Sequence, residues 1–554
     1  MLLVLYGCTG LVSLIIFFRN LIKETSFDKK INYCILVIIL LSMFLRLYKL
    51  NILPGLNIDE AMSGYNGWSL AHFGVDSSLN KWPVYLVAWG DGANVLYAYC
   101  TSIVVKIFGL SVLSYRFTMF AVSSAALLFT IYLIAKTKKN GLYTLISTFV
   151  LLLSPWIIIS SRWGLESNLA PYIMLIGIDF LINAAYSCNG RKYVYLILSG
   201  IFFALTCYAY AVFWYGLPIL YVLIAIDIIR NGKGLLTLRN LALNFISMII
   251  VAFPIIIFAV AQQFQLGQIK LGILTIPKMF GHRSNATTIL SEQNKIIAIF
   301  HNLYDGLKMF LINSDGQDWN SISGGSIYST VLLFALIVGI ISVFKLKKDS
   351  KFIDNAFHYW LLSALLIIVI VRPSITHWNY LLIPVLYIVI EGIFYLISLD
   401  KNNIVSVSLV ISLIFSVGYF SVTYFHSNAN LFQTNSNASQ ILDKKVINTF
   451  NNKSTNRVFI EKGFFTPDNQ FASARFYSPI SPYKWNNEKD YPNSKSKLIP
   501  LFKSGKYRFT VPSNDSVEKG DIVVVQKNKK NNYDGYRKSL TTTQNGLIFY
   551  ILVY

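Results

Sequence analysis

The sequence contains repeated apolar runs, each long enough to cross a lipid bilayer. About twelve stretches approach the roughly 20 mostly apolar residues that a transmembrane helix needs. Because backbone amides inside a bilayer must bond within the chain, such runs predict helices. We therefore expect an all-α polytopic membrane bundle. The predicted spans are 3–18, 31–48, 114–135, 141–158, 169–187, 194–210, 213–229, 240–262, 327–345, 356–371, 379–398 and 404–425.

The composition supports this fold class and excludes others. Hydrophobic residues make up 55% of the 554 residues, charged residues only 13%, and the mean hydropathy is +0.53, outside the usual range of soluble domains. The net charge is +22, which basic loops at an anionic membrane surface explain. Since no nucleic-acid-binding motif accompanies this charge, we expect no nucleic-acid partner. The five cysteines have no CxxC spacing, so they indicate neither a zinc site nor a disulfide framework.

Clusters of Lys and Arg between the runs predict the orientation, because such residues concentrate in cytoplasmic loops. All clusters fall on one side when the short segment 94–109, which contains Lys106, is not counted as a span. This segment either spans or lies at the surface. We expect a multi-pass plasma-membrane protein with both termini outside the cytoplasm. The other extracytoplasmic loops are 50–112, 159–168, 263–326 and 372–378.

Three regions follow from this pattern. Residues 1–30 form an extra N-terminal span and a cytoplasmic loop, and residues 31–425 form the membrane domain. From His426 the chain becomes polar, with short β-like runs such as Arg457-Val-Phe-Ile and Asp521-Ile-Val-Val-Val-Gln. Residues 427–554 contain 19 Lys+Arg and 9 Asp+Glu, a net charge of 19 − 9 = +10. We expect 426–554 to be a small extracytoplasmic α/β or β-rich domain.

An acidic pair, Asp59-Glu60, follows the apolar run 31–48 after only ten residues. A carboxylate at a membrane face is costly to desolvate, so it usually lies in a watery cavity where it has a function. Such a group can act as a general base that takes a proton from an acceptor hydroxyl. The alternative is an ordinary solvated loop, and the spacing alone does not separate the two interpretations.

Arg162 and Glu166 lie in another predicted outer loop, four residues apart. This spacing puts both side chains on one helix face. They form either part of a ligand site or a local ion pair at a helix end.

Two further outer arginines are candidates for binding an anion. Arg283 follows His282 in the largest predicted outer loop, and Arg372 directly follows a span. The planar guanidinium matches phosphate oxygens, although lipid headgroups or local carboxylates are equally suitable partners. His282 and His377 can serve as ligands or bases, but a single interfacial histidine is more often a hydrogen-bonded structural residue.

Over residues 31–400, the chain resembles the GT-C superfamily of integral-membrane glycosyltransferases. Within it, the resemblance is to bacterial relatives of protein O-mannosyltransferases and of the lipid A aminoarabinose transferase. The motifs that carry it are Asp59-Glu60, Ala88-Trp-Gly-Asp91 with Leu96-Tyr97, Lys106-Ile-Phe-Gly-Leu with Tyr115-Arg116-Phe, Ser154-Pro-Trp with Ser161-Arg162 and Glu166-Ser-Asn168, and Tyr208-Ala-Tyr210 before Gly216-Leu-Pro218.

The resemblance implies an inverting sugar transfer from a polyprenyl-phosphate donor at the outer face, with Asp59 as the catalytic carboxylate. It also implies a group of residues that bind the acceptor or support the loop, and a group that binds the donor phosphate. The first group is Glu60, Asp91, Arg162 and Glu166, and the second is Arg283, Arg372 and His282.

Two of the departures from the family pattern concern the predicted site. Many relatives have Asn-Arg where this chain has Asn379-Tyr380, which removes one phosphate contact. Arg162 and Glu166 stand where oligosaccharyltransferases of the superfamily carry an acidic metal motif. Because this stretch holds a single acid, we expect no metal and no other cofactor.

We therefore expect a hexosyl or pentosyl transferase that modifies an envelope glycan, a teichoic-type polymer or a protein. Its partners are the lipid-linked donor, that acceptor and the bilayer. A polysaccharide polymerase or ligase is one alternative, and a lipid-linked glycan flippase or transporter is another. A transporter predicts ionisable residues buried within the spans and inverted repeats. We expect the charged residues to cluster at the span ends, which favours the enzyme.

Overall fold

The computed structural model describes most of the membrane half of the chain and parts of the C-terminal region. The described residues are 27–88, 92–231, 234–279, 287–316, 330–345, 351–427, 456–460, 472, 475–484, 503–504, 507–508, 512–544 and 547–554. By their contacts they divide into two units. Unit 1 comprises residues up to Tyr48, Met119–Ile256 and Ser284–Tyr424, and unit 2 comprises Lys49–Thr118, Ile257–Arg283 and Phe425–Tyr554.

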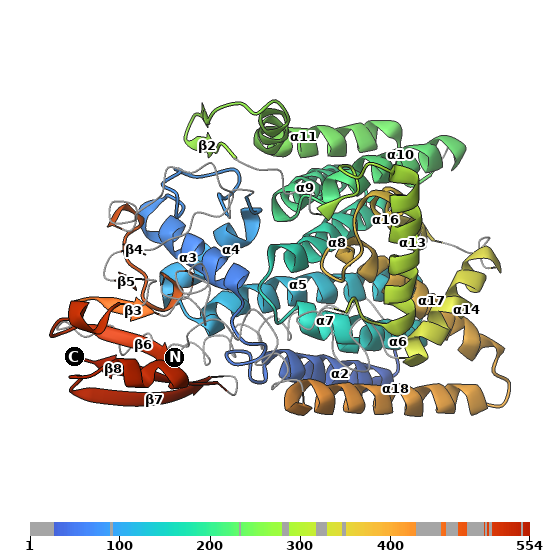
Figure 1. The fold of residues 1–554 in the computed structure, drawn as a ribbon. Coiled ribbons are helices and arrows are strands. Elements are labelled where there is room, and N and C mark those ends of the chain that lie inside the picture. Colours follow the sequence, from blue (N-terminus) through green and yellow to red (C-terminus); the bar gives the residue numbers. More distant parts are fainter. Residues whose placement is uncertain are drawn as a thin grey trace. The chain divides into compact units, whose positions relative to one another are not determined.

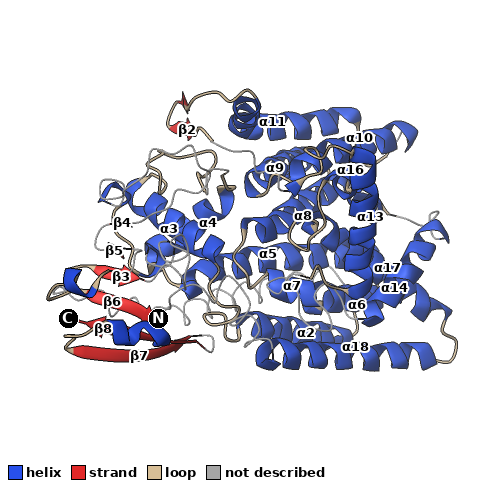
Figure 2. Cartoon of the chain, viewed as in Figure 1, coloured by secondary structure: helices blue, strands red, loops and turns tan. Residues whose placement is uncertain are grey.

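Helices dominate the described chain, as Figure 2 shows. Unit 1 and the helices that it shares with unit 2 contain α2 (Lys29–Leu47), α5 (Val112–Lys138), α6 (Gly141–Leu153), α7 (Pro155–Ser160), α8 (Glu166–Ala185), α9 (Asn189–Ala209), α10 (Phe213–Asn231), α11 (Leu238–Gln263), α13 (Lys295–Ile312), α14 (Thr330–Lys345), α15 (Phe352–Ser363), α16 (Leu365–Ile370), η2 (Asn379–Leu381), α17 (Leu382–Leu399), α18 (Ile404–Val422) and η3 (Thr423–Ser427).

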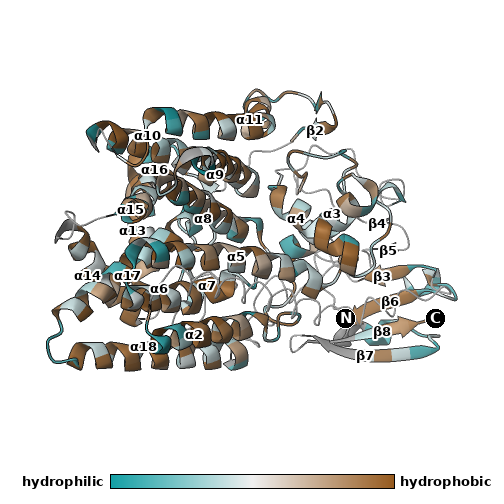
Figure 3. Cartoon of the chain, turned by 180° about the vertical axis from the view of Figure 1, so that it is seen from behind, coloured by the Kyte–Doolittle hydropathy of each residue, from teal (hydrophilic) through white to brown (hydrophobic). Residues whose placement is uncertain are grey.

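The predicted membrane bundle is confirmed. Every predicted span except 3–18, which lies outside the described residues, coincides with a helix or with two consecutive helices. Within the described residues, nine helices are long and apolar enough to cross a membrane. α2 and α18 are largely brown, that is apolar, in Figure 3. The chain is therefore a multi-pass membrane protein.

One predicted span is interrupted by a residue with extended backbone. The run 141–158 forms two helices, α6 and α7, because Ser154 is extended and Pro155 begins the second helix. Proline fits the first helical position, where its missing N–H is not needed, and it disfavours helical backbone at the residue before it. α7 is wholly buried and most residues of α6 are buried, so this segment belongs largely to the interior of unit 1.

Close backbone contact joins α14 to α17. The Cα of Gly392 faces the backbone of α14 so closely that an added Cβ would lie 2.0 Å from the carbonyl oxygen of Ala335 and 2.7 Å from the nitrogen of Gly339. In a bilayer, helices associate through such small residues because lipid removes the hydrophobic drive between them. These two glycines allow the crossing.

Unit 2 contains two short helices of the first predicted outer loop. α3 (Ile58–Phe73) packs against α4 (Leu96–Phe108), with Gly67 of α3 close to Ala98 and Thr101 of α4. The ambiguous segment 94–109 forms α4. Its 13 residues extend over about 20 Å, less than the roughly 30 Å of a bilayer core. This helix is therefore too short to cross alone. The hairpin strands β1 (Ile269–Leu271) and β2 (Leu274–Ile276) also belong to unit 2.

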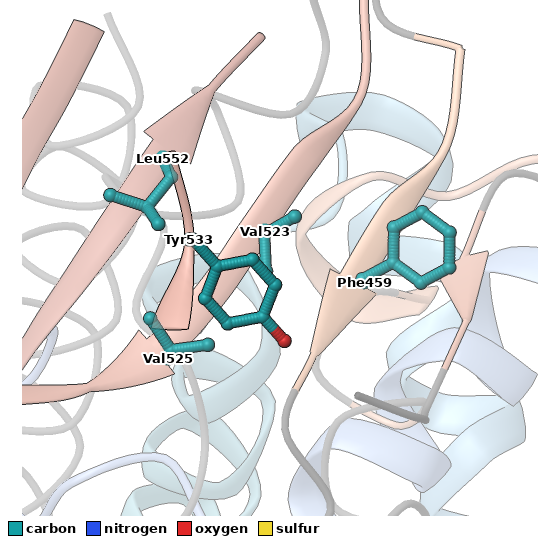
Figure 4. Close-up of a cluster of buried hydrophobic side chains, with 5 residues drawn as sticks. All are labelled: Phe459, Val523, Val525, Tyr533 and Leu552. Carbon is teal, nitrogen blue, oxygen red and sulfur yellow. The ribbon is translucent and has the colours of Figure 1, made fainter. Parts of the chain in front are cut away.

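The C-terminal region forms the small sheet that its β-like runs predict. Its strands are β3 (Val458–Ile460), β4 (Lys503–Ser504), β5 (Tyr507–Arg508), β6 (Ile522–Gln526), β7 (Lys538–Gln544) and β8 (Leu547–Val553), in the order β4-β5-β3-β6-β8-β7. Pairing is parallel between β3 and both β5 and β6, and antiparallel elsewhere. One face is buried by the side chains drawn in Figure 4, namely Phe459, Val523, Val525, Tyr533 and Leu552.

Candidate active site

The acidic pair lies in the first turn of α3 and not in an irregular loop. Figure 1 labels this helix. Asn57 caps this helix: its side-chain oxygen accepts from the Asp59 backbone N–H at 2.7 Å, and its own N–H donates to Glu60 at 3.1 Å. This reciprocal arrangement is a capping box, which satisfies N–H groups that a helix end leaves free. The Asn57-x-x-Glu60 spacing is the signal in the sequence that predicts this helix start.

The carboxylate of Glu60 is fully buried and paired with Arg116 in the first part of α5. Arg116 Nε lies 2.8 Å from Glu60 Oε1, and Nη2 lies 2.5 Å from Oε2. The same guanidinium donates to the carbonyl oxygens of Leu50, Pro54 and Gly55 at 3.1, 2.7 and 3.1 Å. Arg116 therefore holds both the helix start and the turn before it. Sequence reasoning placed Arg116 in a motif but gave it no role.

Asp59, by contrast, is exposed. Its backbone N–H is fixed by the capping bond that it donates to Asn57, directly beside the buried ion pair of its neighbour. A negative charge in the first turn of a helix is favoured by the helix dipole. The two acids thus differ in environment: one carboxylate is buried and paired, and the other is accessible to a ligand.

A segment of the C-terminal region contacts α3 within unit 2. The Tyr65 hydroxyl donates to the carbonyl of Ile480 at 2.8 Å, and the Arg475 guanidinium lies 4.9 Å from the centre of the Tyr65 ring. Phe476 lies against Gly64 and meets the ring of Tyr115 edge-on, at 6.2 Å between centres. Burial raises the pKa of the Tyr65 hydroxyl above its ordinary value, so it acts as a donor. The helix that carries Asp59 is therefore supported by residues more than 400 positions later.

Arg162 is fully buried in unit 1. Its Nη1 donates to the carbonyl oxygens of Leu45 and Arg46 at 2.7 and 2.9 Å, and its guanidinium lies 5.5 Å from the centre of the Tyr424 ring. The contacts with α2 satisfy carbonyl groups in its last turn. Glu166 begins α8 and lies in the first turn of that helix.

Arg372 follows α16 and is partly exposed. Its Nη2 forms an ion pair with Glu292, and its carbonyl oxygen lies 3.2 Å from Nδ1 of His377. Arg372 and Glu292 both line a pocket of about 770 Å³ in unit 1, together with His301, Asp305 and Lys308 of α13. Sequence reasoning missed these three residues, although their spacing is that of one helix face.

Some predicted site residues cannot be placed. Asp91, His282 and Arg283 lie outside the described residues. Among the residues that the structure describes, no group of three or more His, Cys, Asp or Glu side chains is arranged to hold a metal ion.

The expectation that charged residues cluster at the span ends is wrong for Asp179. This carboxylate is fully buried within α8 and accepts from the Thr130 hydroxyl of α5 at 2.7 Å. Glu391 likewise lies within α17, with an oxygen 2.9 Å from Nε2 of His358. Helix packing hides these groups from lipid and supplies polar partners, which hydropathy alone does not reveal.

Comparisons with solved structures give the fold. Crystal structures of ArnT from Cupriavidus metallidurans, in the apo state and bound to undecaprenyl phosphate, match with TM-scores of 0.51 and 0.53, each at 10% identity over 93% of this chain and 97% of that chain. A crystal structure of the Archaeoglobus fulgidus oligosaccharyltransferase with Zn and sulfate matches with a TM-score of 0.46, at 13% identity over 87% of this chain and 59% of that chain. No family model matches the sequence, and neither does any curated protein. The likeness to ArnT, over nearly the whole of both chains, confirms the predicted resemblance at the level of structure: the chain has the GT-C fold.

Proposed function

We propose that this chain is a glycosyltransferase that moves a sugar from a polyprenyl-phosphate donor to a cell-envelope acceptor on the extracytoplasmic face. The observation that carries the proposal is the contrast between Asp59, exposed in the first turn of α3, and the buried capping box and ion pair that fix this turn. A base must be accessible and rigidly held, because misplacement of a reacting group costs rate. The fold shared with ArnT bound to undecaprenyl phosphate supports a lipid-linked donor.

In the proposed reaction, the acceptor oxygen attacks the anomeric carbon opposite the leaving phosphate. The new carbon–oxygen bond forms as the bond to the phosphate oxygen breaks, and the phosphate keeps the electron pair. The acceptor proton passes to the Asp59 carboxylate, which acts as general base. This single displacement inverts the anomeric configuration and requires no cofactor or metal.

The leaving phosphate needs fixed positive charge nearby. Arg372 and Arg283 are the arginines that we assign to it, with His282 beside Arg283 in the sequence. Arg372 is suited to this role because its guanidinium is partly exposed in the wall of a pocket. Its pairing with Glu292 means that the phosphate would compete with that carboxylate.

The other acids have supporting roles in this proposal. Glu60 holds the turn that presents Asp59, since both its oxygens are bonded to Arg116. We assign Asp91 and Glu166 to acceptor binding or loop support, and Arg162 to support of the end of α2, on the basis of its bonds to Leu45 and Arg46.

The experiment is complementation of a deletion strain by wild type, Asp59→Asn and Asp515→Asn. Asp515 is the matched control, because it is also an exposed Asp in the first turn of a helix, the short η5 (Asn514–Ser516). The readouts are the sugar composition of the envelope and transfer of labelled sugar from a short-chain polyprenyl-phosphate sugar in isolated membranes. We expect a sugar substituent to be lost on deletion and restored by wild type and Asp515→Asn only.

Full restoration by Asp59→Asn at equal expression would contradict the role of Asp59 as base. Loss of a lipid-linked intermediate from the outer leaflet, with transfer activity intact in disrupted membranes, would instead favour a flippase. A change in polymer length without loss of any sugar would favour a polymerase or ligase.

A further inference from the structure

The C-terminal end of α3 carries aromatic side chains that have no part in the proposed chemistry. The centre of the Trp68 ring lies 5.0 Å from that of His72 and 5.6 Å from that of Phe73. Tyr483, from the C-terminal region, meets the Phe73 ring edge-on at 6.2 Å between centres. Phe73 and Tyr483 are both exposed. Two distant segments of the chain, both in unit 2, thus bring aromatic rings together at one surface.

Trp82 adds another exposed ring beside the end of α3. Its indole lies against Gly74, the C-cap of α3, where an added Cβ would be 3.5 Å from the ring. The indole also stacks on Tyr99 of α4, with the two ring planes 12° apart. The backbone of Trp82 has a φ of 42°, which is rare for a bulky residue, and such strain is concentrated at functional sites. The fold thus keeps this indole exposed although its backbone is strained. We call the following four residues the aromatic patch: Trp68, Phe73, Trp82 and Tyr483.

The surroundings of the aromatic patch are polar, which distinguishes it from the lipid-facing helices. Each exposed ring of the patch is next in sequence to an exposed imidazole or ammonium side chain, and these neighbours are His72, Lys81 and Lys484. In α3, all of which is described, only Asp59, His72 and Phe73 are exposed, so this helix offers no exposed aliphatic side chain to lipid. The large exposed side chains of α18, by contrast, are chiefly Ile and Val. The patch therefore suits a ligand with both apolar and polar groups better than it suits a membrane.

We propose that the aromatic patch binds a glycan chain, whose sugar rings stack on the exposed aromatic rings. The flat side of a pyranose carries C–H groups, which are attracted to the negative face of an aromatic ring. The hydroxyl groups at the rim of the sugar stay in contact with water or with polar side chains. Exposed apolar patches with a polar rim commonly mark interaction sites, and this one offers both kinds of contact. Glycan binding itself does not depend on the proposed reaction.

The position of the patch indicates the size of the acceptor, an inference that rests on the proposed function. Phe73 is the last residue of α3, and Asp59 lies in the first turn of the same helix. The two residues are 73 − 59 = 14 positions apart, which corresponds to about 21 Å along the helix axis. A single sugar cannot extend over this length. The acceptor is therefore an oligosaccharide or polysaccharide that lies on the patch while its reacting hydroxyl reaches Asp59.

The test is photo-crosslinking of the full-length chain in the cells that produce it. Benzoylphenylalanine, an aromatic residue like those it replaces, is introduced at Phe73 or at Tyr483. Ile107 is the matched control, because it is an exposed position of α4 in the same unit but lies outside the patch. After irradiation the protein is purified, and mass spectrometry and periodate staining identify its adducts as carbohydrate, phospholipid or protein.

We expect carbohydrate adducts at positions 73 and 483 and phospholipid adducts at position 107. Phospholipid at all three positions would overturn the proposal and make the patch a membrane anchor. A protein adduct at 73 and 483, or the absence of any adduct there, would also overturn it. The same labels in an Asp59→Asn chain separate this proposal from the proposed function. Carbohydrate adducts in a variant that retains full transfer activity would support the patch and contradict only the role of Asp59.

A second variant, Phe73→Leu, keeps an apolar side chain at the patch but removes the ring. The acceptor in this assay is envelope glycan isolated from the deletion strain. We expect the KM for this acceptor to rise roughly 2- to 10-fold, the effect of one lost ring contact, and the KM for the donor to stay the same. An unchanged acceptor KM would overturn the assignment of the patch to the acceptor.

Discussion

Glu60 and Arg116 form an ion pair in which both side chains are fully buried. Two hydrogen bonds join them, with nitrogen–oxygen distances of 2.8 and 2.5 Å. The residues are 56 positions apart in the sequence. The pair joins the start of α3 to α5, and its acid is the immediate neighbour of the exposed Asp59. The helix turn that carries the proposed base is thus held by an ion pair that is buried from solvent.

We predict that Glu60→Gln lowers the stability of the protein, by about 3–5 kcal/mol, because removal of one partner leaves the Arg116 charge buried and unpaired. The measurement is the melting temperature of the purified protein in detergent. Asp59→Asn is the matched control, since its side chain is exposed and we expect its melting temperature to stay within about 1 °C of wild type. Equal melting temperatures for wild type and Glu60→Gln would show that the pair is dispensable for the fold.

We predict a smaller loss for Asn57→Ala, about 1 kcal/mol, because this substitution removes a single helix cap. Asn57→Asp keeps an oxygen that can accept from the Asp59 N–H, so it should retain most of the stability. Activity should follow the same order if the cap positions Asp59. An Asn57→Ala enzyme with full activity and reduced melting temperature would separate the cap from the proposed chemistry.

Much of the fold could be predicted from the sequence because hydropathy marks membrane-spanning helices strongly. The same signal failed for helices that do not span. α3 and α13 lie in segments predicted as loops. Each helix mixes polar and apolar residues, and which of its faces is buried depends on the elements that pack against it. The Asn57-x-x-Glu60 capping pattern could have revealed the start of α3, and the apolar spacing of Phe300, Leu303 and Leu307 could have revealed α13.

The candidate site was less predictable, because its contacts join distant residues. Asp59 and Glu60 stand out by their position after a span, but nothing local shows that one is buried and the other exposed. The partner of Glu60 is 56 residues away, and the support of Tyr65 by Ile480 crosses 415 residues. Only the packing of the folded chain brings such groups together.

The crossing of α14 and α17 gives a prediction about packing within the bundle. In Gly392→Ala the new Cβ would lie 2.0 Å from the Ala335 carbonyl oxygen, so the helices must separate. We expect a loss of about 1–3 kcal/mol, the usual cost of overpacking. Gly418→Ala in α18 is the control, because an added Cβ there meets nothing within 4 Å. The comparison of melting temperatures and of yield in membranes tests this crossing. Equal melting temperatures and equal yields for the two variants would contradict this close crossing.

Asp76 gives a prediction about pH. Burial raises the pKa of this carboxyl above its ordinary value, although hydrogen bonds from Asn80 and Ser78 and the nearby charge of Arg475 act in the opposite direction. As pH rises above the ordinary value, the unfolded chain loses this proton before the folded chain does, so stability falls until the raised pKa is passed.

The difference in melting temperature between wild type and Asp76→Asn should therefore favour wild type most at the acid end of a series from about pH 4 to 7. The Asn variant cannot ionise, and other groups cancel in the difference. The opposite result is a melting-temperature difference that shifts in favour of wild type as the pH rises. It would mean that the three hydrogen bonds to Asp76 outweigh its burial, and that the pKa of this carboxyl is lowered.

Arg372 allows a test of the donor site that is separate from the proposed base. If its guanidinium binds the donor phosphate, Arg372→Gln should raise the KM for the polyprenyl-phosphate sugar by roughly 10- to 100-fold, the equivalent of a charged hydrogen bond worth about 1.5–3 kcal/mol. Glu292→Gln should lower that KM or leave it unchanged, because it releases Arg372 from the ion pair with Glu292. A purely structural pair predicts a different result: both variants would lose melting temperature to a similar extent, and neither would change the donor KM. The opposite signs expected for the two KM values are what distinguish phosphate binding from a surface ion pair.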